Sequence, residues 1–296
     1  MISILNLWYA RAVVLSRIVL VCGLAVVTVL AAGCGGGGHS EDHVVAAFYP
    51  LAFAAAQVAP AGLAVDDLTP PGAEPHDLEL TARDVERLRD AALVVYAGGG
   101  FQPAVEDAVG DRDGTSLDVL DSIRPIDGVE GRDPHVWLDP IRYAQVARAI
   151  AAALGRPHAA APLVRRLESL DGDFRRGLAH CARREIVTSH AAFAYLADRY
   201  GLEQVPLVGL TPEAEPAAKD LGRLVEDVRG AGATTVFFEP LVSSRLAETV
   251  AREARVSTAV LDPLEGLTAE QRERGADYFS VMRENLAALR TALGCT

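Results

Sequence analysis

Short apolar runs alternate with longer helical stretches along most of the chain, and this pattern occurs in two blocks of similar length. Eight apolar runs predict strands: 44–50, 63–70, 93–99 and 116–122 in the first block, and 185–190, 203–210, 234–240 and 257–263 in the second. Segments between them, such as 82–91 and 218–232, have the spacing of helices. Because this alternation is typical of parallel sheets covered by helices, we expect an α/β fold with two lobes, each a mostly parallel sheet flanked by helices.

The segment between the two blocks has a different pattern. Apolar residues recur every three or four positions at Leu163, Leu167, Leu170, Phe174 and Leu178. This spacing predicts an amphipathic helix of several turns. We interpret residues 159–184 as one long rigid helix that joins an N-terminal lobe, residues 44–158, to a C-terminal lobe, residues 185–296. A stiff connection of this kind would limit how far the lobes can hinge.

The first 33 residues have the features of a targeting segment. Arg11 and Arg17 precede an uncharged run, residues 18–33, that is shorter than the ~20 apolar residues of a membrane-spanning helix and ends on small residues. The following "LAAGC" resembles the lipobox of bacterial lipoproteins, which implies cleavage before Cys34 and lipid attachment to its sulfur. The glycine-rich residues 34–43 then form a flexible tether. An uncleaved anchor helix is the alternative.

Charge narrows the range of partners. Removal of Arg11 and Arg17 with the signal would leave 26 basic and 40 acidic residues, a net charge of −14. Such a surface repels nucleic acid, which binds clustered lysine and arginine, and it favours the approach of cations. We therefore expect no nucleic-acid partner, and we expect the chain to act as a monomer anchored on the extracytoplasmic face of the membrane.

Two of the four cysteines could form a disulfide. Cys22 lies in the predicted signal and Cys34 would carry lipid, which leaves Cys181 and Cys295. An extracytoplasmic compartment permits disulfides. We predict that these two cysteines pair and tie the C-terminal end of the chain to the start of the second lobe. Two separate thiols are the alternative.

Three histidines follow predicted strands, and an acid occupies the same kind of position after a fourth. They are His76, His135 and His190, with Asp262 at the end of the strand 257–263. In open α/β sheets, ligands bind beyond the carboxyl ends of the strands. We therefore expect these four side chains to meet in the cleft between the lobes. Three imidazoles and one carboxylate suit zinc(II), whereas magnesium and calcium prefer oxygen donors.

Neighbouring residues could prepare such a site. Pro75 suits the first turn of a helix, whose positive end would keep His76 neutral and ready to bind a cation. Glu74, Asp139 and Glu239 are candidates to hydrogen-bond and orient a ligating imidazole. A capping or solvated role is the alternative for each of these acids.

Five motifs in order carry a family resemblance. They are "FYPLAFAAAQVA", "PPGAEPHDLEL", "HVWLDP", "TSHAAFAYLADRYGL" and "FFEPLVSSRLAETVAREA". Together they resemble the zinc/manganese group (cluster A-I) of ABC-transporter solute-binding proteins, over nearly all of the chain from residue 44. The resemblance implies two α/β lobes on a rigid backbone helix with the metal buried between them. It gives the ligand roles to His76, His135, His190 and Asp262, and the histidine in "TSHAAF" resembles the zinc members.

The resemblance implies a function. We expect a lipid-anchored extracytoplasmic receptor that captures one zinc(II) per chain, delivers it to an ABC permease with its ATPase, and catalyses no reaction. Zinc affinity should fall as pH drops through the histidine range. Many zinc members carry a histidine-rich loop between the first two ligands, but residues 77–134 contain no histidine. Either a metal chaperone delivers the ion or His39 and His43 assist weakly.

Three alternatives remain at this point. A member of the same group could carry manganese or iron(II) instead. A secreted zinc hydrolase would keep an open metal position with three protein ligands and a water, and the chain has no H-E-x-x-H motif. An adhesin could use the same scaffold for attachment to a host.

Overall fold

Parallel strand pairing organises both halves of the chain. The computed structural model describes residues 43–128, 131–212 and 218–296, and Glu41–Thr296 forms one compact unit. The predicted signal, Cys34, His39 and the tether up to residue 42 lie outside the described residues. His43 is the first residue of a strand and not part of the tether.

The first sheet has the order β2-β1-β3-β4, and all of its strands run parallel. Its strands are β1 (His43–Ala46), β2 (Ala64–Asp67), β3 (Leu93–Tyr96) and β4 (Thr115–Asp118). Val44, Val45 and Ala46 in the central strand β1 are fully buried. A parallel strand is covered on both faces, which explains why β1 is a continuous apolar run rather than an alternating one.

The second sheet repeats this design with the order β10-β9-β7-β8, again all parallel. Its strands are β7 (Glu185–Thr188), β8 (Glu203–Pro206), β9 (Thr235–Phe238) and β10 (Ser257–Val260). Each of the eight predicted strands is present, shorter than its apolar run. A small antiparallel hairpin of β5 (Asp127–Gly128) and β6 (Gly131–Arg132), which the apolar pattern does not predict, precedes His135.

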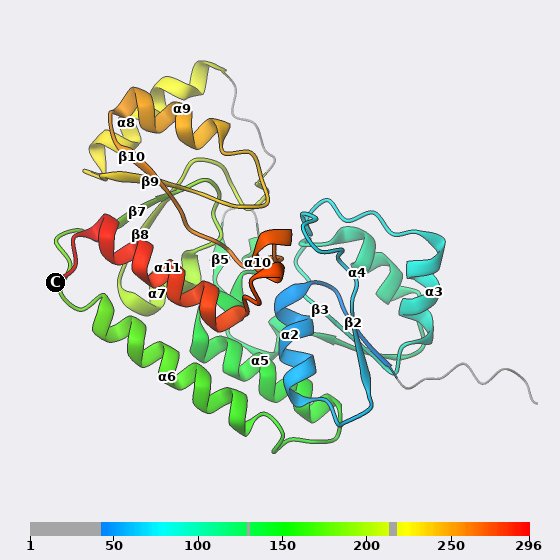
Figure 1. Cartoon of the computed structure of the whole chain (residues 1–296). Helices are drawn as coiled ribbons and strands as arrows, with labels where there is room; N and C mark the ends of the chain where they lie inside the picture. Colours follow the sequence, from blue (N-terminus) through cyan, green and yellow to red (C-terminus); the bar gives the residue numbers. More distant parts are fainter. Residues whose placement is uncertain (1–42, 129–130, 213–217) are drawn as a thin grey trace, which may run out of the picture. The chain divides into compact units, whose positions relative to one another are not determined.

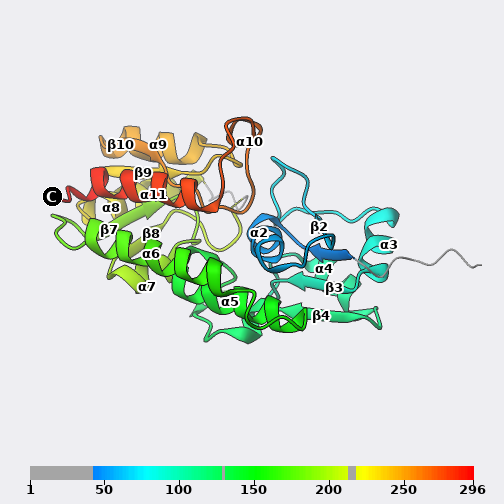
Figure 2. The same cartoon turned by 60° about the horizontal axis from the view of Figure 1, so that its bottom comes forward.

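Helices cover the sheets, as Figures 1 and 2 show. In the first half they are α2 (Tyr49–Val58), α3 (Ala82–Asp90), α4 (Pro103–Gly110) and the short η1 (Val119–Ser122), followed by η2 (Val136–Leu138). In the second half they are α7 (Ala194–Tyr200), η3 (Ala218–Asp220), α8 (Leu221–Gly230), α9 (Arg245–Ala254), α10 (Ala269–Glu273) and α11 (Tyr278–Leu293). Together with the two sheets, they confirm the α/β class predicted from the sequence.

In the sequence, two long helices rather than one separate the strands of the first sheet from those of the second. They are α5 (Pro140–Ala153) and α6 (Ala161–Gly177), which pack against each other. Leu163, Leu167, Leu170 and Phe174 form the buried stripe of α6, as their spacing predicts. The helix ends at Gly177, however, and does not continue to residue 184. Leu178 is its C-terminal cap, and the chain then turns toward Cys181.

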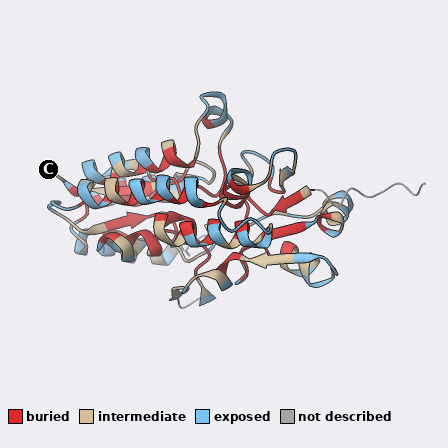
Figure 3. Cartoon of the chain, turned by 90° about the horizontal axis from the view of Figure 1, so that it is seen from below, coloured by how far each residue is buried: buried red, intermediate tan, exposed pale blue. Residues whose placement is uncertain are grey.

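One apolar cluster contains residues of both sheets, and a second cluster, which includes Val187 and Val236, lies within the second half. The residues of the first cluster run from β1 to α11, and the buried faces of the helices are turned toward the strands (Figure 3). Phe53 of α2 stacks on Tyr278 of α11 with ring centroids 5.8 Å apart, and Tyr143 of α5 lies 4.7 Å from the same ring. Because aromatic residues of α2, α5 and α11 interlock here, large relative motions of the lobes would have to break a continuous core.

The predicted disulfide is confirmed. Cys181 and Cys295 are bonded, and the two residues are 114 positions apart in the sequence. The bond joins the segment after α6 to the end of α11, next to a backbone bridge between the same two residues. None of the helices in the described part of the chain has the length and apolar character needed to cross a membrane.

Candidate metal centre

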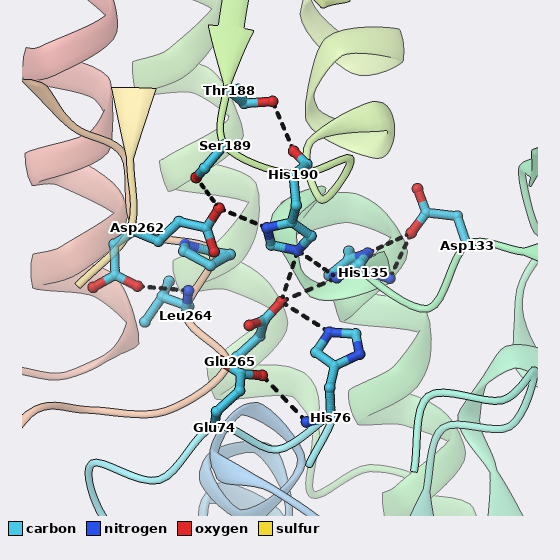
Figure 4. Close-up of polar contacts among 12 residues, drawn as sticks. Glu74, His76, Asp133, His135, Thr188, Ser189, His190, Asp262, Leu264 and Glu265 are labelled. Atoms are coloured by element: carbon cyan, nitrogen blue, oxygen red, sulfur yellow. Dashed lines mark hydrogen bonds and ion pairs between the residues drawn. The ribbon is translucent and has the colours of Figure 1, made fainter. Parts of the chain in front are cut away.

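Four side chains that follow strands of the two sheets meet in one buried cluster. His76 lies in the loop after β2, and His135 follows β4 and precedes η2. His190 comes two residues after β7, and Glu265 follows β10. One ligand atom from each residue lies within 4.8 Å of the ligand atoms of the other three. Figure 4 shows the three imidazoles turned toward the Glu265 carboxylate. The structure thus brings together the three histidines selected from the sequence, from the carboxyl ends of strands in both sheets.

The separations between donor atoms are those of one small coordination sphere. Glu265 Oε1 lies 3.0 Å from His135 Nε2, 3.3 Å from His190 Nε2 and 3.6 Å from His76 Nε2. The Nε2 atoms of His135 and His190 are 3.4 Å apart. Ligand atoms placed tetrahedrally at ~2.0–2.1 Å from a zinc ion are about 3.4 Å apart. These four separations, from 3.0 to 3.6 Å, lie close to that tetrahedral spacing.

The cluster also has the electrostatics of a cation site. His76 Nε2 and Glu265 Oε2 are buried and have no hydrogen-bond partner among the described residues. The side chains of His135, His190 and Glu265 are at most 1% exposed. Several acceptor atoms facing one another away from water are costly unless a positive charge lies among them. A bound cation would satisfy all of them at once.

Two carboxylates orient the imidazoles of His135 and His190. His135 Nδ1 lies 2.7 Å from Asp133 Oδ1, and His190 Nδ1 lies 2.6 Å from Glu239 Oε1. Because a carboxylate accepts hydrogen bonds, each neutral imidazole carries its proton on Nδ1 and directs the lone pair of Nε2 into the cluster. Ser189 donates a further hydrogen bond to Glu239 Oε1. The predicted orienting role of Glu239 thus has the required geometry.

Protons compete with a metal for these nitrogens. Burial lowers the pKa of His76 below its ordinary value. Burial also lowers the pKa of His135 and His190, but nearby carboxylates outweigh it and leave both values raised. Burial raises the pKa of Glu265, yet the surrounding imidazoles hold it well below its usual range. Metal binding therefore has to displace protons from the two imidazoles that contact Glu265 most closely.

The expectation that Asp262 joins the three histidines is wrong, because Glu265 provides the carboxylate of the cluster. Both oxygens of Asp262 are used elsewhere: Oδ1 accepts a hydrogen bond from the Leu264 amide, and Oδ2 accepts one from Gln271 Nε2. Burial raises the pKa of Asp262 to about 6. Leu264 has a φ of 59°, so the chain turns in the left-handed region between the two acids and presents Glu265 to the site.

The expected helix start at Pro75 is absent from the structure. His76 does not lie in the first turn of a helix, because α3 starts only at Ala82 and residues 71–81 form turns and loops. Glu74 accepts a hydrogen bond from the His76 backbone at 3.2 Å, so it positions the loop through the main chain.

Asp139 has the capping role that was its alternative. Its side chain accepts hydrogen bonds from the Ile141 and Arg142 amides at the start of α5 and pairs with Arg199. The acid that orients His135 is Asp133, which the sequence analysis did not select. The signal for it was the spacing "D-P-H", which places a carboxylate two residues before the ligand.

Two cavities are each lined by one residue of the cluster. One of about 90 Å³ is lined by His76, Phe101 and Thr211, among others. The other, of about 240 Å³, is lined by Tyr49, Asp67, Glu265 and Arg272, among others. His76 has the most exposed side chain of the four cluster residues, at 7%. Solvent therefore comes closest to the cluster beside His76.

The fold and the site together define a two-lobed α/β protein with a candidate metal centre at the carboxyl ends of its strands. The family model described as "Zinc-uptake complex component A periplasmic" matches residues 44–292. This match covers most of the chain, and the chain belongs to that family.

Individual relatives agree with this assignment. The chain is 31% identical to the high-affinity zinc uptake system protein ZnuA of Bacillus subtilis, over 91% of this chain and 96% of that protein. It is 34% identical to the zinc-binding lipoprotein AdcA of Streptococcus pneumoniae, over 84% of this chain but only 55% of that protein. The chain thus spans about half the length of this streptococcal relative.

A solved structure shows the same architecture. The Zn(II)-bound ZnuA-like domain of Streptococcus pneumoniae AdcA superposes with a TM-score of 0.73 at 36% sequence identity. The superposition covers 85% of this chain and 98% of that domain. The two-lobed arrangement of parallel sheets is therefore the fold of the family.

Proposed function

We propose that this chain captures zinc(II) outside the cytoplasm and delivers it to an ABC permease and its ATPase. The relatives named above are a zinc uptake protein and a zinc-binding lipoprotein, which supports the same cargo here. The observation that carries the proposal is the buried cluster of His76, His135, His190 and Glu265. Its donor types and its spacing both suit zinc.

The donor set favours zinc over the alternatives within the family. Three imidazole nitrogens and one carboxylate oxygen match the donors of a four-coordinate zinc ion, and the Nε2 atom of His190 lies 3.4 Å from that of His135 and 3.3 Å from Glu265 Oε1. Manganese favours sites richer in carboxylate, carbonyl and water oxygens. A single carboxylate among three imidazoles therefore supports tighter binding of zinc than of manganese.

The same count of donors supports transport over hydrolysis. A catalytic zinc keeps one position for water or substrate, with three protein ligands in the other positions. Here four protein side chains surround the centre of the cluster, and three of them are at most 1% exposed. A closed, buried site suits an ion that is bound for transport and later released unchanged. We propose no reaction for this chain.

The proposal includes a lipid anchor on Cys34, which lies outside the described residues. Its support is the "LAAGC" sequence, together with relatives named as lipoproteins. Mass spectrometry of the protein from its native membrane tests this point. An acylated N-terminal Cys34 is the expected result, and an unmodified chain that begins at Met1 would contradict it.

Elemental analysis tests the cargo. Protein purified without chelator is expected to contain about one zinc per chain and little manganese or iron, because four donors fit one ion. Cells that lack the chain are expected to take up less zinc at low external zinc, and the wild-type gene should restore uptake where His135→Ala does not. Manganese retained in preference to zinc would overturn the choice of ion.

A further inference from the structure

The residues that connect β10 to the cluster are held from several sides. The Asp262 amide donates to Asn285 Oδ1 at 2.9 Å, and Asn285 Nδ2 donates to the Asp262 carbonyl oxygen at 2.7 Å. Trp137 Nε1 donates to the Pro263 carbonyl oxygen at 2.7 Å. Asn285 belongs to α11 and Trp137 to η2. Two side chains from distant parts of the sequence therefore fix the main chain just before Glu265.

The Asp262 side chain then spans the turn that follows. Its Oδ1 accepts from the Leu264 amide at 2.7 Å, as Figure 4 shows. Its Oδ2 accepts from Gln271 Nε2 at 2.6 Å. Gln271 is itself fixed, because its Oε1 accepts from the Thr268 amide in the capping box of α10. A side chain that bonds an amide two residues ahead stabilises a tight turn.

Leu264 needs such support. Its φ of 59° lies in the left-handed region, which residues with a side chain seldom adopt. The side chain is fully buried, so packing and the bond to Asp262 together hold the backbone there. Glu265 is the next residue, and the direction of its Cα–Cβ bond depends on this backbone angle. If Leu264 relaxed to a negative φ, the Glu265 carboxylate would turn away from the histidines.

We propose that Asp262 is a positioning residue, which holds Leu264 in the left-handed conformation and thereby aims Glu265 at His76, His135 and His190. This inference rests on the proposed zinc-binding function. Asp262 does not touch the ion. It acts only through Glu265, so its loss should matter only while Glu265 is present.

A double-mutant cycle tests it. Zinc affinity is measured on the metal-stripped full chain by competition with a chromogenic zinc chelator, for wild type, Asp262→Ala, Glu265→Ala and the double variant. Asp262→Ala is expected to weaken zinc binding about 10- to 100-fold, as loss of an orienting partner does. In the Glu265→Ala background the same change is expected to cost less than about threefold, because no carboxylate remains to be aimed.

A second variant separates positioning from general destabilisation. Leu264→Gly in the Asp262→Ala background lets the turn adopt a positive φ without strain. Zinc affinity is expected to recover several-fold over Asp262→Ala alone, while the melting temperature falls further because the buried Leu264 side chain is lost. A merely structural role of Asp262 would make affinity and stability fall together.

A control variant and a milder substitution at Asp262 complete the test. Glu168→Ala, on the exposed side of α6, is the control and should bind zinc like wild type. If Asp262→Ala does not fold, Asp262→Ser replaces it in the same cycle, because serine keeps an oxygen for the Leu264 amide. The loss of zinc affinity is then expected to be smaller, and to vanish again in the Glu265→Ala background. An equal loss in both Glu265 backgrounds, or no loss in either, would overturn the inference. Absence of zinc binding by wild type would instead refute the proposed function.

Discussion

Glu265 Oε1 lies 3.0 Å from His135 Nε2, although 130 residues separate the two in the sequence. His135 follows the last strand of the first sheet, and Glu265 follows the last strand of the second. The contact exists only because both sheets direct their carboxyl ends to one place. It joins the lobes through the site itself, so that an ion bound there would also hold the lobes together.

The carboxylates that orient the histidines should control affinity. Asp133→Asn and Glu239→Gln each replace the carboxylate that accepts the Nδ1 hydrogen of His135 or His190 with a neutral amide, whose oxygen is a weaker acceptor. We expect each change to weaken zinc binding about 10- to 100-fold, measured by chelator competition. Asp121→Asn, whose side chain is 74% exposed, is the control. Wild-type affinity in both orienting variants would show that the imidazoles need no such support.

Trp137 should report binding. Its ring centroid lies 5.3 Å from that of His135, and its side chain is fully buried. In a full-length Trp8→Phe variant it is the only tryptophan. We expect zinc to change its fluorescence with a stoichiometry of about one per chain, and His135→Ala to abolish the change. A flat titration of the metal-stripped protein, with folding verified, would count against the site.

The sequence was sufficient for the fold and for three of the four cluster residues. Apolar runs at strand length mark buried parallel strands, and His76, His135 and His190 could be placed because each lies at or beyond the carboxyl end of such a run and before the next helix. The carboxylate could not be placed in the same way. Asp262 and Glu265 both follow β10, and only the left-handed φ of Leu264 decides which of them reaches the histidines. Sequence pattern rarely predicts a positive φ at a leucine.

The local structure around His76 and His135 was harder to predict from the sequence. Pro75 suggested a helix start, but the chain stays in turns until Thr81 and Asp84 form the capping box of α3. Asp139 and Asp133 flank His135 at comparable distances in the sequence. Asp139 accepts hydrogen bonds from amides of α5 and forms an ion pair with Arg199. Asp133 therefore is the acid that orients the imidazole. Competition between caps, ion pairs and ligands is decided by geometry in three dimensions.

The disulfide should matter for stability. Cys181 and Cys295 close a loop of 114 residues, and removing such a cross-link should lower the free energy of unfolding by roughly 2–4 kcal/mol. Urea unfolding of Cys181→Ser/Cys295→Ser measures this, with reduced wild type as the matched comparison. Free thiols on Cys181 and Cys295 in unfolded, unreduced protein would contradict the bond.

Asp67 should make stability depend on pH. Burial raises its pKa from 3.8 to about 7, despite the opposing effects of the Thr69 amide and Arg272. The folded state therefore holds this proton more tightly than the unfolded state, and stability falls as pH rises from about 4 to about 7. Asp67→Asn removes this cost, so the gain in melting temperature should be larger at about pH 8 than at about pH 4. An equal gain at both pH values would show that Asp67 ionises normally.

The most direct test of the metal centre is a crystal structure of the zinc-loaded protein with anomalous data collected on both sides of the zinc absorption edge. We expect one zinc peak per chain, at ~2.0–2.2 Å from His76 Nε2, His135 Nε2, His190 Nε2 and a Glu265 carboxylate oxygen. Asp262 should keep its contact with the Leu264 amide. A zinc peak elsewhere in the chain, or one bound by Asp262 in place of Glu265, would contradict the account.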